Sequence, residues 1–260
     1  MKFVKMQGTG NDFVVIDGRK EDLSGVNLSE LGIKLCDRNF GIGADGLLIA
    51  SPSSSADIKM RVINSDGSEA EMCGNGIRCF AKYIYESMEN KKELISVETL
   101  SGIVIPTIID YKGKAALVEV DMGVPKEKKK ARVIKYDAVL VSMGNPHCVI
   151  FTDDLNKIDI SSEGPAIEND KMFPNRTNVE FVQVSGKKEI TVKVWERGSG
   201  ETLACGTGAC ASVVAGVLTG RLERDVLVHL PGGNLDIELG EDEHVILRGP
   251  AETVFEGEIK

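Results

Sequence analysis

Apolar and polar residues alternate along most of the chain in short runs, the pattern of strands with one buried face. Clear examples are Ile58 to Asn64 and Ile190 to Glu196, and similar runs lie at 103–109, 116–120, 139–141, 179–184 and 226–230. Two stretches have helical spacing instead. The one after Cys73 is amphipathic, with Arg78, Lys82 and Glu86 expected on its polar faces. The other, 209–218, is apolar on nearly every side, which predicts a buried helix.

One pattern occurs twice, 132 residues apart. Residues 69–76 and 201–208 both read as strand, turn, cysteine and a Gly-x-Gly that opens a helix. The match continues upstream, so Asn64 and Glu196 are equivalent positions. A weaker similarity pairs residues 10–16 with residues 144–150. We therefore expect an α+β protein of two pseudo-symmetric domains, each a sheet wrapped around a central helix. The expected halves are 1–117, joined by the C-terminal segment 250–260, and 118–249.

Composition fits two ordinary globular domains, because 260 residues give each half a typical domain size. The net charge of −9 argues against a nucleic-acid partner, which normally requires a basic face. The one basic run, Lys126 to Arg132, is expected to be a solvated connection. The chain starts without a sustained apolar segment and nowhere approaches a membrane span, so we expect a cytoplasmic protein with no membrane partner.

The six cysteines are expected to be reduced thiols, since 260 residues need no disulfide framework. Their spacings, C-x5-C and C-x4-C, and only three histidines argue against zinc. The run 41–46 matches G-x-G-x-x-G, but it follows a helix-like segment and leads into a buried strand. A dinucleotide site requires the reverse order, so we reject a nicotinamide or flavin cofactor. Cys36, Cys79, Cys148 and Cys210 are interpreted as core residues.

Cys73 and Cys205 have a different setting. Each comes just before a helix start, where unpaired backbone N–H groups and the positive end of the helix dipole favour a thiolate. Two such groups on opposite walls of a cleft could remove a proton from one face of a carbon and return one to the other. The helix starts Gly74-Asn75 and Gly206-Thr207 would offer N–H groups to the substrate carboxylate.

In all these motifs the chain resembles the diaminopimelate epimerase family, along essentially its whole length. The matching stretches are 10–13, 64–66, 73–76, 144–148, Asn178, 196–198 and 204–210. The resemblance implies interconversion of L,L- and meso-2,6-diaminopimelate for lysine and peptidoglycan precursor synthesis, without pyridoxal phosphate or metal. It also implies an active site between the two halves, and a homodimer.

The resemblance assigns roles to single residues. His147 and Glu196 would tune the thiols, with Glu196 also receiving a substrate ammonium and Arg197 the distal carboxylate. The amides expected to hold the substrate are those of Asn11, Asn64, Asn145 and Asn178. Two positions depart from the family. Gly46 stands where many members carry a substrate-contacting Gln, and Phe255 stands where some have a Tyr at the dimer interface.

Two other kinds of function remain open from the sequence. A proline racemase or hydroxyproline epimerase shares the paired cysteines, but its small cyclic substrate would not need Glu196, Arg197 and several Asn side chains to hold a distal amino acid group. Isomerases of phenazine biosynthesis resemble the fold but lack the cysteine pair. Both cysteines are present here.

Overall fold

The computed structural model describes residues 1–259, which form two compact units. Unit 1 comprises Met1–Val120 together with the C-terminal segment from Gly249 onward, and unit 2 comprises Asp121–Arg248. The chain therefore leaves unit 1 after β9 and returns to it within the last strand, β18 (Val245–Glu258). No helix in residues 1–259 is long and apolar enough to cross a membrane.

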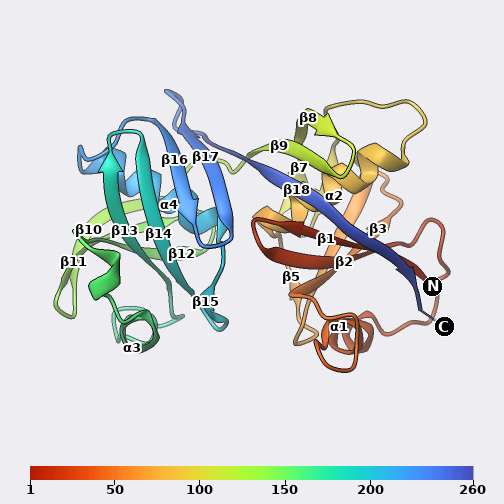
Figure 1. Ribbon diagram of the computed structural model, residues 1–260, viewed down its shortest axis with the longest axis horizontal. Coiled ribbons are helices and arrows are strands. Elements are labelled where there is room, and N and C mark those ends of the chain that lie inside the picture. The colour runs from red at the N-terminus through yellow and green to blue at the C-terminus, as the bar shows by residue number, and fades with distance from the viewer. Residues whose placement is uncertain (260) are drawn as a thin grey trace. The chain divides into compact units, whose positions relative to one another are not determined.

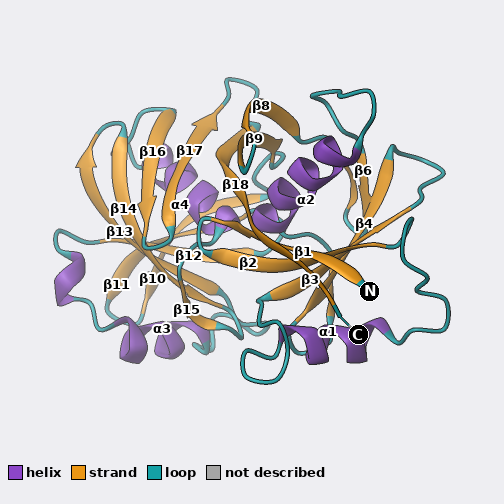
Figure 2. Cartoon of the chain, turned by 45° about the vertical axis from the view of Figure 1, so that its right-hand side comes forward, coloured by secondary structure: helices purple, strands orange, loops and turns teal. Residues whose placement is uncertain are grey.

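Unit 1 wraps its strands around one long helix, α2 (Gly74–Ser87), and Figure 2 shows α2 among them. Strand β2 pairs with β3 in parallel, β3 with β4 antiparallel, and β4 with both β5 and β6. A second helix, α1 (Leu28–Cys36), packs on β3 and β4. The strands are β1 (Lys2–Gly8), β2 (Asn11–Asp17), β3 (Gly46–Ser51), β4 (Ile58–Asn64), β5 (Glu69–Ala70), β6 (Val97–Thr99), β7 (Gly102–Val104), β8 (Thr107–Lys112) and β9 (Ala115–Asp121).

Unit 2 repeats this plan around α4 (Gly206–Leu218), as Figure 1 shows. Strand β12 pairs with β13 in parallel, β13 with β14 antiparallel, and β14 with both β15 and β16. Helix α3 (Ile160–Glu168) packs on β13, β14 and β15. The remaining elements are β10 (Glu127–Val133), β11 (Tyr136–Ser142), β12 (Pro146–Phe151), η1 (Leu155–Lys157), β13 (Asn178–Gly186), β14 (Glu189–Glu196), β15 (Gly200–Thr202), β16 (Asp225–Leu230) and β17 (Gly233–Leu239).

The duplication seen in the sequence extends to the elements. Helices α3 and α4 begin 132 residues after α1 and α2, and the strands around them pair in the same order and direction. The predicted α+β class, with a sheet around a central helix in each half, is confirmed. Helix α4 is buried from Gly208 to Gly216, as its apolar sequence predicts, and Gly220 just beyond it has a left-handed φ of 69° that suits a glycine after a helix end.

Two sequence predictions were wrong. Arg78 and Lys82 were expected on polar faces of α2, yet both are fully buried. Strand β18 supplies the reason, because Arg78 Nε donates to the carbonyl of Pro250 at 3.2 Å and Lys82 Nζ donates to Thr253 Oγ1 at 2.8 Å. The basic run Lys126 to Arg132 is no connection: most of it forms β10, which pairs with β11 and exposes its charged side chains.

Candidate active site

Cys73 is the N-cap of α2. Its backbone is extended (φ −137°, ψ 117°), and the N–H of Gly76 donates to its Sγ at 3.4 Å. The sulfur therefore occupies the place where helix dipole and unpaired N–H groups stabilise negative charge. A Cβ at position 76 would be in tight contact, 3.3 Å from the Cβ of Cys73 and 3.3 Å from Leu48, which favours glycine there.

Hydrogen-bonded amides surround the Cys73 sulfur. Asn11 Oδ1 lies 3.9 Å from Sγ and accepts from Asn75 Nδ2 at 3.3 Å. Asn75 Oδ1 in turn accepts from Nη1 of the buried Arg78 at 3.0 Å. These bonds connect the sulfur to a guanidinium through two of the residues that sequence analysis assigned to substrate binding.

Charged groups fix Asn11 from the other side. Its Nδ2 donates to Asp45 at 2.5 Å, and Arg38 binds both Asp45 and Asp12. Burial alone would raise the pKa of Asp12, but hydrogen bonds from Arg38 and Lys5 outweigh it and lower that pKa to about 2. The run 41–46 thus contributes Asp45 to the support of Asn11, a role that its glycine pattern did not indicate.

Cys205 is the N-cap of α4 and is only 5% exposed. Its Sγ lies 3.4 Å from Thr207 Oγ1. Burial, and then the charges of Glu196 and Glu180, raise the pKa of the Cys205 thiol well above its usual range. Burial also raises the pKa of Glu196, partly offset by hydrogen bonds from Thr202 and Cys205.

Sheet register explains why distant residues of unit 2 meet. His147 on β12 pairs with Asn178 on β13, and Val179 next to it pairs with Trp195 on β14, which brings Glu196 to the same end of the sheet. In unit 1 the corresponding row contains Phe13, Gly46 and Asn64. Asn64 Nδ2 donates to Ser68 Oγ at 3.0 Å, within the turn before Cys73.

His147 is 1% exposed and both ring nitrogens have partners. Nδ1 lies 2.7 Å from Oε1 of Glu180, and Nε2 lies 3.0 Å from Oδ1 of Asn145. Asn145 Nδ2 donates to Thr207 Oγ1 at 3.2 Å. Sequence reasoning missed Glu180, although its alignment with Leu48 of the first half, 132 residues earlier, was a usable signal.

Arg197 lies in an exposed turn after β14. The backbone N–H of Arg197 donates to Asn178 Oδ1 at 2.9 Å, and Asn178 Nδ2 donates to the carbonyl of Pro146 at 2.9 Å. Glu168, at the end of α3, accepts from the N–H of Gly198 at 2.9 Å. The side chain of Asn178 thus fixes the backbone on both sides of the half-site, in addition to any contact with substrate.

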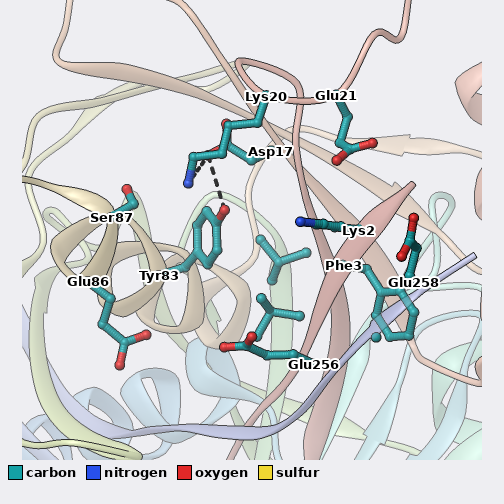
Figure 3. A pocket seen from close by; sticks show the side chains of 13 residues that line it. Lys2, Phe3, Asp17, Lys20, Glu21, Tyr83, Glu86, Ser87, Glu256 and Glu258 are labelled. Carbon is teal, nitrogen blue, oxygen red and sulfur yellow. Dashed lines mark hydrogen bonds and ion pairs between the residues drawn. The ribbon is translucent and has the colours of Figure 1, made fainter.

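A pocket of about 780 Å³ lies elsewhere in unit 1. Figure 3 shows Tyr83, Glu86 and Ser87 from the last turns of α2 facing Lys2 and Glu256 across it. Because a helix rises about 1.5 Å per residue, this pocket is about 20 Å along α2 from Cys73. Its lining includes neither Cys73 nor Cys205.

Known proteins match the whole chain. The diaminopimelate epimerase family model matches residues 3–128 and 139–254. A diaminopimelate epimerase of Pelotomaculum thermopropionicum is 52% identical, over 99% of this chain and 98% of the relative. One from Desulfitobacterium hafniense is 51% identical, over 99% and 97%.

A solved structure shares the fold at lower sequence similarity. The phenazine biosynthesis protein of Bacillus anthracis has a TM-score of 0.77 at 15% identity, covering 100% of this chain and 99% of its own. The resemblance recognised from the motifs is confirmed, and the matched residues include both N-cap cysteines. The chain belongs to the diaminopimelate epimerase family, enzymes that are isomerases acting on amino acids.

Proposed function

We propose that this enzyme interconverts L,L- and meso-2,6-diaminopimelate by moving an α-proton between substrate and the Cys73 and Cys205 sulfurs. The observation that carries the proposal is the duplicated half-site, in which each unit presents a cysteine as the N-cap of its central helix. Inversion of a carbon needs a base on one face and an acid on the other, and two equivalent half-sites supply both.

The proposed reaction conserves protons. One sulfur starts as a thiolate and takes the α-proton, which leaves a carbanion-like centre, and the other starts as a thiol and gives its proton to the opposite face. After turnover the two sulfurs have exchanged states, so their titration belongs to the pair. N–H groups at the starts of α2 and α4 bind the α-carboxylate and stabilise the charge that develops on it.

Other side chains hold the rest of the substrate in this proposal. Arg197 binds the distal carboxylate and Glu196 an ammonium group, because a guanidinium forms a paired contact with a carboxylate and a carboxylate suits a cation. Asn11, Asn64 and Asn145 contact polar groups of the substrate, and Asn178 orients the Arg197 turn. Proline has no distal amino acid group, so the Arg197 turn favours diaminopimelate over the racemase alternative.

The wider setting is part of the same proposal. Diaminopimelate feeds lysine and peptidoglycan synthesis, and family resemblance supports a cytoplasmic homodimer that needs neither pyridoxal phosphate nor a metal ion. Activity should therefore survive exhaustive chelation and carbonyl reagents. Loss on dialysis against a chelator, with recovery on adding zinc, would contradict the cofactor-independent mechanism.

Incubation with L,L-diaminopimelate in deuterated water tests the proposal directly. We expect deuterium at the α-carbon and formation of the meso isomer, and we expect Cys73→Ala and Cys205→Ala to abolish epimerisation. The matched controls are Cys79→Ala and Cys210→Ala, buried cysteines inside the same two helices, which should retain activity. A Cys73→Ala protein with a near wild-type rate would overturn the two-base mechanism, and efficient racemisation of proline would favour the alternative.

A further inference from the structure

Unit 2 contains a buried histidine–glutamate pair that the proposed reaction does not use directly. Glu180 on β13 is fully buried, and its Oε1 lies 2.7 Å from Nδ1 of the equally buried His147 on β12. Its second oxygen, Oε2, is the one buried side-chain nitrogen or oxygen atom without a hydrogen-bond partner among residues 1–259. Burying a carboxylate in this way opposes folding, so the pair calls for another explanation.

The other unit shows that the fold does not require this pair. Val149 pairs with Glu180 across β12 and β13, and the equivalent pairing in unit 1 is Val15 with Leu48. The position equivalent to His147 is Phe13, at the same place in the row. Phe and Leu therefore occupy in unit 1 the positions that His and Glu occupy in unit 2.

Glu180 lies against the first turn of the cysteine helix. A Cβ on Gly208 would be 2.7 Å from Glu180 Oε1 and 3.3 Å from the Cβ of Cys205. The equivalent Gly76 of unit 1 faces a methyl group of Leu48 at 3.3 Å. The lack of a side chain at 208 thus admits a carboxylate next to the turn that carries the sulfur.

Hydrogen bonds connect the pair to the sulfur: His147 Nε2 contacts Asn145 Oδ1, Asn145 Nδ2 contacts Thr207 Oγ1, and Thr207 Oγ1 contacts Cys205 Sγ. A carboxylate only accepts, so Nδ1 donates to Glu180. With the Asn145 oxygen facing Nε2, the ring holds protons on both nitrogens and the Thr207 hydroxyl is free to donate to a thiolate. If the Asn145 amide is turned over, its Nδ2 donates to Nε2 of a neutral His147 ring and its Oδ1 accepts from the Thr207 hydroxyl. The Thr207 oxygen can then accept a hydrogen bond from a Cys205 thiol.

We propose that Glu180 is a positioning residue for the Cys205 half-site: it holds His147 so that, in the substrate-free site, the ring takes up at Nε2 the proton that the Cys205 thiol loses on ionisation. This inference rests on the proposed function of Cys205. Ionisation of the sulfur is then matched by a cation connected to it through Asn145 and Thr207, and the net charge of the buried cluster stays constant.

The groups that face Cys205 make such a cation necessary. Glu196 reaches it from β14, Glu180 from β13 and Thr207 from α4, while His147 on β12 is the one cationic side chain in the hydrogen-bonded chain just described. Burial and the two carboxylates all raise the pKa of the Cys205 thiol. A thiolate at this position would otherwise be a third negative charge in a site with little solvent.

Glu180→Gln provides the test, because glutamine still accepts from Nδ1 but carries no charge. The readout is the pH profile of iodoacetamide alkylation at Cys205, followed by peptide mass spectrometry with Cys73 as internal reference. We expect the Cys205 profile to move up by about one pH unit, about tenfold slower alkylation at neutral pH, with that of Cys73 unchanged. The matched control is Leu48→Met at the equivalent position, which should change neither profile.

Two other results for the Cys205 alkylation profile of Glu180→Gln would contradict the proposal. If Glu180 acts only as a nearby negative charge, its removal makes the thiolate easier to form and moves the Cys205 profile to lower pH. An unchanged profile would make Glu180 purely structural, and either result overturns the proposal. Epimerisation by Cys205→Ala would instead refute the proposed function, and the alkylation profile would still report on Glu180.

A double variant keeps the proposal testable if glutamine at 180 disturbs folding. His147→Phe with Glu180→Leu reproduces the pair found in unit 1, and replacing a buried charged pair by apolar side chains is often neutral or stabilising. We expect this protein to fold and to show the same upward shift at Cys205. Unaltered alkylation of Cys205 in the folded double variant would contradict the proposed coupling.

Discussion

Unit 1 and unit 2 build their cysteine half-sites on the same backbone but support them with different side chains. In unit 1 the hydrogen-bonded chain from Cys73 ends at the guanidinium of Arg78, and the core beneath it contains Leu48. In unit 2 the chain from Cys205 ends at the carboxylate of Glu180. A duplicated fold therefore places its two sulfurs in unequal electrostatic surroundings.

This inequality shows which constraints belong to the fold and which to the chemistry. Both units share the strand order, the N-cap cysteine and a glycine as the third residue of the central helix, Gly76 or Gly208. The charged residues are not shared, since Arg78 corresponds to Cys210, and Glu180 to Leu48. The same backbone accepts either set, so the fold itself does not require the buried charged residues of either unit.

The largest expected effect is on stability, at position 78. Arg78→Leu removes donors to Thr9, Gly74, Asn75 and Pro250 and leaves buried acceptors unsatisfied. We expect the free energy of unfolding to fall by about 3 kcal/mol. Cys210→Ala, at the equivalent position of unit 2, should cost only about 1 kcal/mol. Urea unfolding measures both, and equal losses would remove this distinction between the units.

A substantial effect on activity is expected at Arg197, the exposed turn residue of unit 2. Arg197→Met should reduce kcat/KM for diaminopimelate by an amount equivalent to about 1.5 to 3 kcal/mol, since a charged contact with the distal carboxylate is lost. The equivalent residue of unit 1 is the exposed Ser65, and Ser65→Ala should have little effect. Similar losses in both variants would show that the two turns contribute alike.

The smallest expected effect is a difference in thiol reactivity without substrate. Burial and the charge of Glu196 raise the pKa of the Cys205 thiol, so at a given pH fewer Cys205 sulfurs are thiolates. Cys73, with an N–H and the Arg78 chain beside it, should be alkylated faster by roughly tenfold near pH 8. Glu196→Gln should reduce the difference between the alkylation rates of Cys73 and Cys205. Faster alkylation of Cys205 would reverse the assigned inequality.

Local pattern was enough to predict much of this molecule. The repeat at an offset of 132 residues predicted two equivalent units, and the cysteine before Gly-x-Gly predicted both N-caps, because a helix start depends on a few neighbouring residues. His147, Asn178 and Glu196 were assigned to a site by family resemblance and not by spacing, since the sheet register that brings them to one end of the sheet joins segments separated by many residues.

What the pattern could not predict depends on distant partners. Arg78 and Lys82 have the helical positions of surface residues, and their burial depends in part on β18, about 170 residues later in the chain. Glu180 is a charged residue in the strand-like run 179–184, and charged side chains are rarely fully buried. Its burial arises because α4 covers that side of β13, and a local window does not contain α4.

The return of β18 to unit 1 also sets an order of assembly during translation. Unit 2 is one continuous stretch, Asp121–Arg248, and all of its strands and helices are available once that stretch has left the ribosome. Unit 1 starts earlier but lacks the carbonyl of Pro250 and the hydroxyl of Thr253 until the residues that follow unit 2 are made. The half that starts first therefore completes its core after unit 2 has been made, because the partners of Arg78 and Lys82 lie on β18.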